Sequence, residues 1–161
     1  MTKIITADYQ NPNHEADIIR LMKAYAVDPM GGGQPLAESA INYLCQQLAK
    51  RPYAFTLIGY VDGNAAGLIT CFEQFSTFAC KPLINIHDVV VLKAYRGRGL
   101  SKQMLVAVEQ IAQQKGCCKL TLEVLTGNSV ARAAYRSFGF SGYELLPETG
   151  QAEFWQKVLT A

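Results

Sequence analysis

The feature that most constrains this chain is the stretch VVVLKAYRGRGLSKQML, from Val89 to Leu105. Its first four residues are apolar and β-branched or aliphatic, which is typical of a buried strand, and the glycines that follow break the strand into a turn. From Gly99 onward, apolar side chains recur with the period of a helix. A strand, a glycine turn and a helix in this order predict the first part of a β-α-β unit.

The helix is expected from about Gly99 to Lys115, because Gly116 can end it. The alternating segment CKLTLEVL, residues 118–125, then returns as a strand. Parallel strands joined by a helix make a right-handed crossover in nearly all proteins. Residues 84–125 therefore predict one parallel strand pair.

The rest of the chain predicts hairpins and further helices. Strands are expected over residues 2–9, 53–61, 65–75, 83–92, 140–146 and 153–159, and helices over residues 13–26 and 35–49. Asp62-Gly63-Asn64 can join two strands in a tight turn, since these residues accept positive φ. Asn13 can cap the first helix, and Asn128 can cap a short helix through Phe138. The predicted class is α+β, with a mixed, mostly antiparallel sheet, one parallel β-α-β unit and about four helices.

The length of 161 residues fits a single domain over residues 1–161, and the 50% hydrophobic and 17% charged composition indicates a globular chain. No apolar run reaches the ~20 residues of a membrane span, and MTKIITADYQ lacks the apolar core of a signal peptide. We therefore expect a cytoplasmic protein without a membrane partner. The five cysteines include no C-x-x-C pair and there are only two histidines, so we expect neither a disulfide framework nor a metal site.

Charge is distributed unevenly along the chain. Residues 1–80 contain five basic and seven acidic side chains, whereas residues 81–161 contain ten basic and six acidic ones. The segment from Val89 to Val108 has four basic residues and no acidic one. The second half therefore favours an anionic ligand, while a net charge of only +2 argues against nucleic acid as the partner.

The glycine turn has the properties of an anion site. The first four N–H groups of a helix lack internal partners, and the helix dipole adds about half a positive charge at that end. Gly97 and Gly99 let the backbone approach a ligand closely, and Arg96, Arg98 and Lys102 add charge. We expect the turn to hold a phosphate group, and a merely solvated basic turn is the alternative.

Two common phosphate motifs do not fit. A Walker loop needs a Gly-Lys-Ser/Thr sequence, which this chain lacks. A dinucleotide fingerprint needs G-x-G-x-x-G, and here Lys102 stands where the third glycine belongs. The partial fingerprint is therefore weak support for a dinucleotide, and a solvated basic turn stays open.

The segment Arg96-Gly97-Arg98-Gly99-Leu100-Ser101 resembles motif A of the GNAT (Gcn5-related) N-acetyltransferases, whose pattern is Arg/Gln-x-x-Gly-x-Gly/Ala. Ser101 departs from that pattern only slightly, because serine is also compact. The segment NSVARAAYRSFGF, residues 128–140, resembles motif B. Together with the element order, the resemblance covers nearly the full chain. It implies a GNAT-like fold that binds the pyrophosphate of acetyl-CoA.

The resemblance also implies which residues meet the coenzyme. In the family, the strand before the turn diverges from its parallel neighbour, and the pantetheine arm pairs with the freed backbone. The implied coenzyme-binding residues are Val89, Val90, Val91, Arg96, Gly97, Arg98, Gly99, Leu100, Ser101, Lys102, Asn128, Ala131 and Tyr135. For the valines, only the backbone is expected to bind, since the side chains belong to the core.

The catalytic candidates are Tyr135, His87 and Glu73. Tyr135 matches the tyrosine that protonates the thiolate in the family, although a helix-face aromatic in the core is the alternative. Histidine side chains titrate near neutrality, and His87 stands at an offset where relatives carry a base. Asp88 is not expected to orient His87, because successive strand side chains point to opposite faces. Glu73 and a water chain are the other candidate bases, and His87 can equally be a sheet histidine.

The acceptor site is expected in the first half of the chain. The loop DPMGGGQPL, residues 28–36, lies in the variable region of the family, and Asp28, Met30, Gly31 and Gly32 are its candidate acceptor-binding residues. We expect the acceptor to enter opposite the pyrophosphate turn, near the first two helices and this loop. Plain flexibility is the alternative reading of the glycines.

The resulting hypothesis is an acetyl-CoA-dependent N-acetyltransferase that acts on a primary amine of a small molecule by direct attack in a ternary complex. The alternatives are acetylation of a protein N-terminus or lysine, and a CoA-binding regulatory protein without catalysis. A homodimer stays open.

Overall fold

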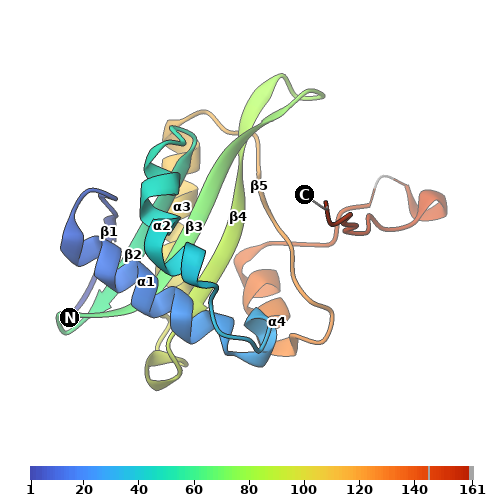
Figure 1. Ribbon diagram of the computed structural model, residues 1–161. Helices are drawn as coiled ribbons and strands as arrows, with labels where there is room; N and C mark the ends of the chain where they lie inside the picture. Colours follow the sequence, from blue (N-terminus) through green and yellow to red (C-terminus); the bar gives the residue numbers. More distant parts are fainter. Residues whose placement is uncertain (145, 160–161) are drawn as a thin grey trace. The chain divides into compact units, whose positions relative to one another are not determined.

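The computed structural model describes residues 1–144 and 146–159 (Figure 1). The chain forms two compact units, residues 1–122 and 123–161. Each unit is described by itself. The prediction of a single domain over residues 1–161 stays a prediction. No helix in the described ranges is long and apolar enough to cross a membrane.

The first unit is built on a five-stranded sheet in the order β1-β2-β3-β4-β5. The strands are β1 (Thr2–Thr6), β2 (Ala54–Val61), β3 (Asn64–Ser76), β4 (Lys81–Val91) and β5 (Leu120–Leu122). The pairs β1–β2, β2–β3 and β3–β4 are antiparallel, and only β4–β5 is parallel. The predicted α+β class, with a mixed sheet and one parallel β-α-β unit, is confirmed.

Helices cover both faces of this sheet (Figure 1). On one face lie α1 (Pro12–Ala26) and α2 (Glu38–Ala49), and on the other lies α3 (Leu100–Gln114). The core between α1, α2 and the sheet includes Ile18, Leu21, Cys45, Ile58 and Leu68, all nearly inaccessible to solvent.

The first two turns of α3 pack directly on two glycines of the sheet. A Cβ added at Gly59 would lie 2.9 Å from Leu100 Cδ1, and one added at Gly67 would lie 2.6 Å from Val90 O and 3.0 Å from Met104 Cε. The side chains of Leu100 and Met104 are 2% and 0% exposed. These contacts set the position of the helix start, and therefore of the glycine turn before it.

Several predicted boundaries are wrong by a few residues. Asn11, not Asn13, caps α1, because its side chain accepts a hydrogen bond from the N–H of Asn13 and Pro12 takes the first helical position. The first strand ends at Thr6, and α2 begins at Glu38 rather than near Pro35. The strand predicted over residues 118–125 is only Leu120–Leu122, because alternation does not show where pairing stops.

The second unit contains α4 (Ser129–Phe138), which begins and ends as predicted. Asn128 caps it through a hydrogen bond from the N–H of Ala131, and Gly139 ends it with φ of 108°. A short 3-10 helix, η3 (Pro147–Thr149), follows.

The two closing strands predicted over residues 140–146 and 153–159 are not formed in the described residues of those ranges. The segment contains one isolated antiparallel bridge between Glu144 and Gln151. Leu145 lies outside the described residues. The alternation of apolar and polar residues in these segments separates two faces of a possible strand but does not provide a strand to pair with. A two-stranded hairpin alone is only marginally stable in water.

Candidate functional site

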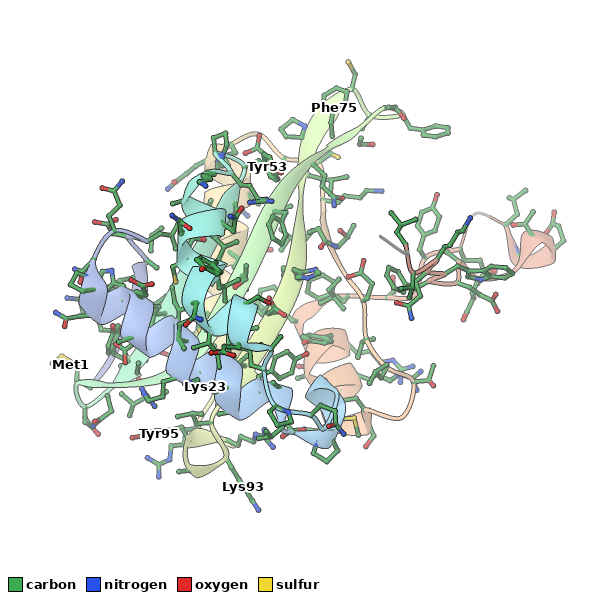
Figure 2. The ribbon with its side chains drawn as sticks, in the orientation of Figure 1. Met1, Lys23, Tyr53, Phe75, Lys93 and Tyr95 are labelled. Atoms are coloured by element: carbon green, nitrogen blue, oxygen red, sulfur yellow. The ribbon has the colours of Figure 1, made fainter. Side chains whose placement is uncertain are left out.

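The glycine turn before α3 has the backbone geometry that an anion site needs. It follows the 3-10 helix η2 (Lys93–Tyr95), which Figure 2 shows beyond the end of β4. Gly97 and Gly99 both have φ of 75°, in the left-handed region, and no side chain caps the start of α3. A Cβ added at either glycine would meet nothing within 4 Å. The uncapped N–H groups and the open space beside them fit a pyrophosphate.

The predicted cations surround the turn, and two of them already have partners. Arg96 donates from Nη2 to Asp28 Oδ2 at 2.9 Å and from Nε to Val91 O at 3.0 Å. The guanidinium of Arg98 lies over the Tyr95 ring, 5.7 Å from its centroid. Lys102 is exposed. The site therefore keeps Arg98 and Lys102 at the surface and ties Arg96 to the loop after α1.

Leu100 and the three valines at positions 89–91 would contact a ligand through their backbone groups. The parallel pairing of β4 with β5 ends at Ile86–Leu122, whereas β4 continues to Val91. Val90 and Leu100 have buried side chains that are 4% and 2% exposed. The stretch Val89–Val91 thus runs past the last residue that is paired with β5.

A β-bulge in β4 corrects the expectation for Asp88. Cys71 of β3 faces Ile86 while Thr70 faces Asp88, so His87 is the extra residue. A bulge interrupts the regular alternation of a strand. Val90 packs in the α1–α2 core, and Asp88, two residues away, shares its face.

His87 points to that same face. Its ring packs edge-on against Phe72 at 5.3 Å between centroids. Phe72 and the next residue, Glu73, point to opposite faces of the sheet. The Glu73 carboxylate accepts a hydrogen bond from Lys115 at the end of α3, so Phe72 lies on the face opposite α3. The expectation that His87 and Asp88 point to opposite faces is therefore wrong, because the bulge adds one residue between two stretches of regular pairing.

Asp88 is a partly buried carboxyl, which local sequence did not single out. Burial raises its pKa above the ordinary value, and the charge of His87 opposes this shift. The negative charges of Asp88 and Asp28, together with burial as the main cause, raise the pKa of Tyr25 on α1. These side chains form a titratable cluster beneath the loop after α1.

Glu73 lies elsewhere. The Oε2 atom of Glu73 is 2.8 Å from Lys115 Nζ. In the pairing of β3 with β4, Glu73 lies opposite Ile84. The structure therefore places Glu73 on the α3 face, away from the face that carries His87 and Asp88.

The candidate acceptor loop is folded onto α1. Asp28 caps the 3-10 helix η1 (Pro29–Gly31) by accepting from the N–H of Met30 at 2.9 Å. A Cβ at Gly31 would lie 2.0 Å from Tyr25 O, so only glycine fits there. Met30 is 41% exposed, and Gly32 has φ of 118°.

The contact with Arg96 corrects the predicted position of this loop. Asp28 touches a side chain of the glycine turn, so the loop does not lie wholly opposite it. The hydrogen bond from Arg96 is the main cause that holds the pKa of Asp28 below its usual range.

The predicted residues of the second unit lie on α4. Asn128 is its cap, Ala131 donates to that cap, and Tyr135 packs edge-on against Phe140 at 5.9 Å. Phe140 also stacks with Phe138 at 6.1 Å, so the end of α4 carries a small aromatic cluster.

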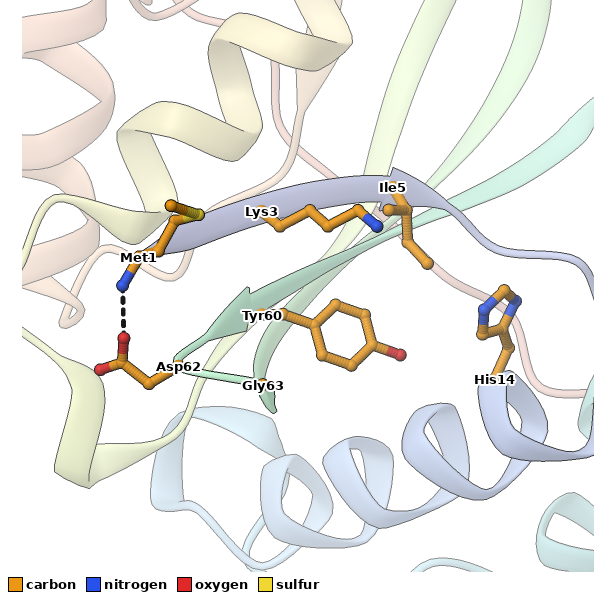
Figure 3. A pocket seen from close by; sticks show the side chains of 7 residues that line it. All are labelled: Met1, Lys3, Ile5, His14, Tyr60, Asp62 and Gly63. Atoms are coloured by element: carbon orange, nitrogen blue, oxygen red, sulfur yellow. Dashed lines mark hydrogen bonds and ion pairs between the residues drawn. The ribbon is translucent and has the colours of Figure 1, made fainter.

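A pocket of about 430 Å³ lies between β1, α1 and the β2–β3 turn (Figure 3). It is lined by Met1, Lys3, Ile5, His14, Tyr60, Asp62 and Gly63. Tyr60 donates to Asp17 at 2.8 Å, and burial is the main cause that raises its pKa to about 12. None of the predicted site residues lines this pocket.

Comparison with known proteins gives a consistent result. Residues 13–140 match the model of the acetyltransferase (GNAT) family. The aminoglycoside N(6')-acetyltransferase type 1 of Salmonella typhimurium is 22% identical over 115 residues, which cover 70% of this chain and 75% of that protein.

Solved structures show the same fold. The aminoglycoside acetyltransferase AAC(6')-Iy, solved with a CoA bisubstrate analogue, has a TM-score of 0.76 at 19% identity and covers 99% of both chains. The ribosomal-protein-alanine N-acetyltransferase of Brucella melitensis biovar Abortus has a TM-score of 0.75 at 16% identity, also over 99% of both chains. With most of its length matched by the family model, the chain belongs to the GNAT acetyltransferase family and is an acyl-CoA-dependent N-acetyltransferase.

Proposed function

We propose that this enzyme transfers the acetyl group of acetyl-CoA to a primary amine of a small molecule, by direct attack in a ternary complex. One observation carries the proposal: the part of β4 that has left β5 leads through the Gly97–Gly99 turn into the uncapped start of α3. In this arrangement, free backbone can bind the pantetheine arm while helix N–H groups bind the pyrophosphate.

Different groups of the protein would bind different parts of the coenzyme. The N–H groups from Gly97 to Lys102 would face the phosphate oxygens, with Arg98 and Lys102 adding charge. Backbone groups of Val89–Val91 would pair with the arm. Asn128 and Ala131, at the start of α4, would contact the coenzyme as the family resemblance implies.

The reaction needs three proton and charge steps. The amine nitrogen attacks the thioester carbonyl carbon, and the C–S bond breaks as the C–N bond forms. Backbone N–H of β4 would stabilise the charge on the carbonyl oxygen. Tyr135 would give its phenolic proton to the departing sulfur, and the amine proton would leave to His87, Glu73 or water.

Small amines are the favoured acceptors. The curated relative is, by its name, an aminoglycoside acetyltransferase, and so is one solved neighbour. Another neighbour is named for acetylating a ribosomal-protein alanine, which keeps a protein N-terminus as the second candidate. Asp28, Met30, Gly31 and Gly32 would shape the acceptor side. A cytoplasmic location and a homodimer stay predictions.

The test combines binding and turnover. Acetyl-CoA at ~100 times its Kd should add about 2.7 kcal/mol to the free energy of unfolding, measured as a rise in Tm. Release of free CoA is then followed with sisomicin, spermidine, tyramine and a peptide with N-terminal alanine. We expect release with at least one of the three small amines. Binding without release would favour the regulatory alternative, release only with the peptide would favour protein acetylation, and no binding would overturn the proposal.

The base is tested separately. His87→Ala should lower the rate most at pH values below the pKa of the acceptor amine, where removal of its proton is needed. Glu73→Gln serves as the comparison, since Glu73 is already paired with Lys115. An unchanged pH–rate profile in His87→Ala would leave Glu73 or water as the proton acceptor.

A further inference from the structure

The pocket drawn in Figure 3 belongs to the first unit and shares no residue with the predicted coenzyme or acceptor site. Its volume of about 430 Å³ falls in the range of about 300–1,000 Å³ that small-molecule sites occupy. Two of its lining residues, Lys3 and Ile5, belong to β1, which is an edge strand of the sheet. A ligand in this pocket would therefore contact none of the residues assigned to acetyl transfer.

Strand pairing explains why a pocket forms here. Lys3 lies opposite Tyr60 and Ile5 lies opposite Ile58, so these four side chains share one face of the sheet. Ile58 belongs to the core beneath α1 and α2, and Ile5 and Tyr60 pack against that core. The next residue outward on the same face of β1 is Lys3, which is charged and exposed. The apolar core therefore stops at this point and leaves the pocket beside the Tyr60 ring.

The acidic groups at the pocket already have partners. Asp17 on α1 accepts hydrogen bonds from the Tyr60 hydroxyl at 2.8 Å and from Arg20 at 3.2 Å. Because burial raises the pKa of Tyr60 to about 12, its hydroxyl stays protonated and keeps donating to Asp17. The carboxylate of Asp62 is paired with the amino group of Met1. A ligand therefore meets no uncompensated negative charge from these two acids.

The donors of Lys3 and His14 remain available to a ligand. Within the part of the chain that the structure describes, the ammonium group of Lys3 forms no hydrogen bond or ion pair. His14 accepts a hydrogen bond from the N–H of Asp8 through Nδ1 at 3.0 Å, so the proton of its neutral ring lies on Nε2. Figure 3 shows the Tyr60 hydroxyl pointing toward His14 and the Lys3 side chain running along β1 in the same direction. The polar groups thus gather at the end of the pocket nearest His14.

We propose that this pocket binds a small organic carboxylate with an apolar body. Lys3 Nζ and the Nε2–H of His14 would hold the carboxylate, since hydrogen bonds from an ammonium group to a carboxylate are among the stronger ones. The apolar body would lie against the Tyr60 ring and the Ile5 side chain. Because the acids at the pocket are paired, the remaining charge of Lys3 makes the wall positive and favours an anion over a neutral or cationic ligand. The site is separate from the acetyl-transfer site and goes beyond the proposed function.

The test is calorimetric titration with phenylacetate, indole-3-acetate and hexanoate, each compared with its own neutral amide. CoA is present at a saturating concentration, so that the acids do not bind at the glycine turn, which is itself suited to anions. We expect at least one acid to bind. That acid should bind about two- to fivefold more tightly than its amide, which is the effect of a partly exposed charge pair.

Two variants of Lys3 locate the site. Lys3→Gln removes the charge from an exposed side chain, so the fold should be kept, as Tm shows. Its affinity for the acid should fall to that for the amide, and Lys3→Glu, which reverses the charge, should bind the amide more tightly than the acid. Lys23→Gln is the matched control, since Lys23 is an exposed lysine in the last turn of α1. This control should bind the acid as wild type does.

Three results would overturn the inference: no acid binds wild type at millimolar concentrations, each acid binds no more tightly than its amide, or Lys3→Gln and Lys23→Gln bind the acid equally. In each case the proposed function stays intact, because the pocket contacts none of its residues. Failure of the amine assay would leave the titration valid in turn, since the Lys3 variants locate the carboxylate without any turnover.

Discussion

Arg96 Nη2 lies 2.9 Å from Asp28 Oδ2, which joins the turn before α3 to the loop after α1. The same guanidinium holds the end of β4 through Val91 O. A residue expected to bind pyrophosphate is therefore paired with a residue expected to line the acceptor side. Because phosphate and carboxylate compete for one guanidinium, coenzyme binding and loop position should be linked.

Asp28→Asn should strengthen acetyl-CoA binding. Asparagine keeps the oxygen that caps η1 but removes the negative charge that competes for Arg96. Exposed ion pairs contribute about 0.2–1 kcal/mol, so the Kd should fall by up to about fivefold. Calorimetry at low and high salt measures the change, which should shrink at high salt. Asp17→Asn, which weakens the separate Arg20–Asp17 pair, should leave the Kd unchanged. A weaker affinity in Asp28→Asn would mean that the pair organises the turn instead of competing with the coenzyme.

Gly97→Val should abolish acetyl-CoA binding at concentrations that saturate wild type. A β-branched residue is strained at φ of 75°, and its side chain occupies the open space assigned to phosphate. Gly116→Val is the matched control, because Gly116 has φ of 68° and equally open surroundings at the other end of α3. Both variants should lose similar stability without ligand, as Tm shows. Equal acetyl-CoA affinity in the two variants would place the pyrophosphate elsewhere.

Gly67→Ala should destabilise the first unit. The new Cβ would lie 2.6 Å from a backbone oxygen, that of Val90, which cannot move as easily as a side chain. Overpacking of this kind costs about 1–3 kcal/mol, seen as a lower midpoint in urea unfolding. Gly142→Ala is the control, since its nearest atom would be 3.9 Å away. Undiminished stability of Gly67→Ala would show that α3 can shift without cost.

Tyr135→Phe should lower kcat while leaving acetyl-CoA affinity nearly unchanged. The variant keeps the ring contact with Phe140 and removes only the phenolic proton. Loss of a general acid typically lowers the rate by about 10²-fold. Steady-state CoA release at saturating substrates measures it, with Tyr143→Phe as the control in the same unit. Full activity in Tyr135→Phe would assign this residue to packing alone.

Asp88→Asn should stabilise the protein at neutral pH and lose this advantage in acid. The pKa of Asp88 is raised in the folded state, so the folded protein binds a proton at this residue more tightly than the unfolded chain does. The stability that this proton contributes is complete below the unfolded value of ~3.9 and is lost as pH rises through the folded value. Tm measured from pH 4 to pH 8 should show the two proteins converging at the acidic end. A constant difference across that range would contradict the raised pKa.

Sequence alone predicted those structural features of the candidate site whose geometry is local. Three features depend on residues only a few positions apart and could therefore be predicted: the glycine turn, the start of α3 and the Asn128 cap. The same holds for the hairpin at Asp62-Gly63-Asn64, where positive φ is required within the turn itself. Glycine and capping residues act on their own backbone, which is why these predictions were confirmed.

Features that depend on pairing between distant segments could not be predicted from the sequence. Asp28 and Arg96 are separated by 68 positions, and nothing in either segment indicates their contact. The bulge at His87 arises from the register between β3 and β4, and it reverses the face that simple alternation assigns to His87 relative to Asp88. The closing strands at residues 140–146 and 153–159 show the same limit, because a strand forms only against a partner.

The sequence by itself therefore determined the order of the elements as far as α4 and the glycine turn before α3, since each follows from periodicity and backbone chemistry within short segments. Two of its motifs resemble those of the family to which the chain belongs. Only the tertiary structure decided which acids are paired and on which face of the sheet they lie. Register and side-chain pairing are settled when distant segments pack together, and that packing paired Asp28 with Arg96 and Glu73 with Lys115.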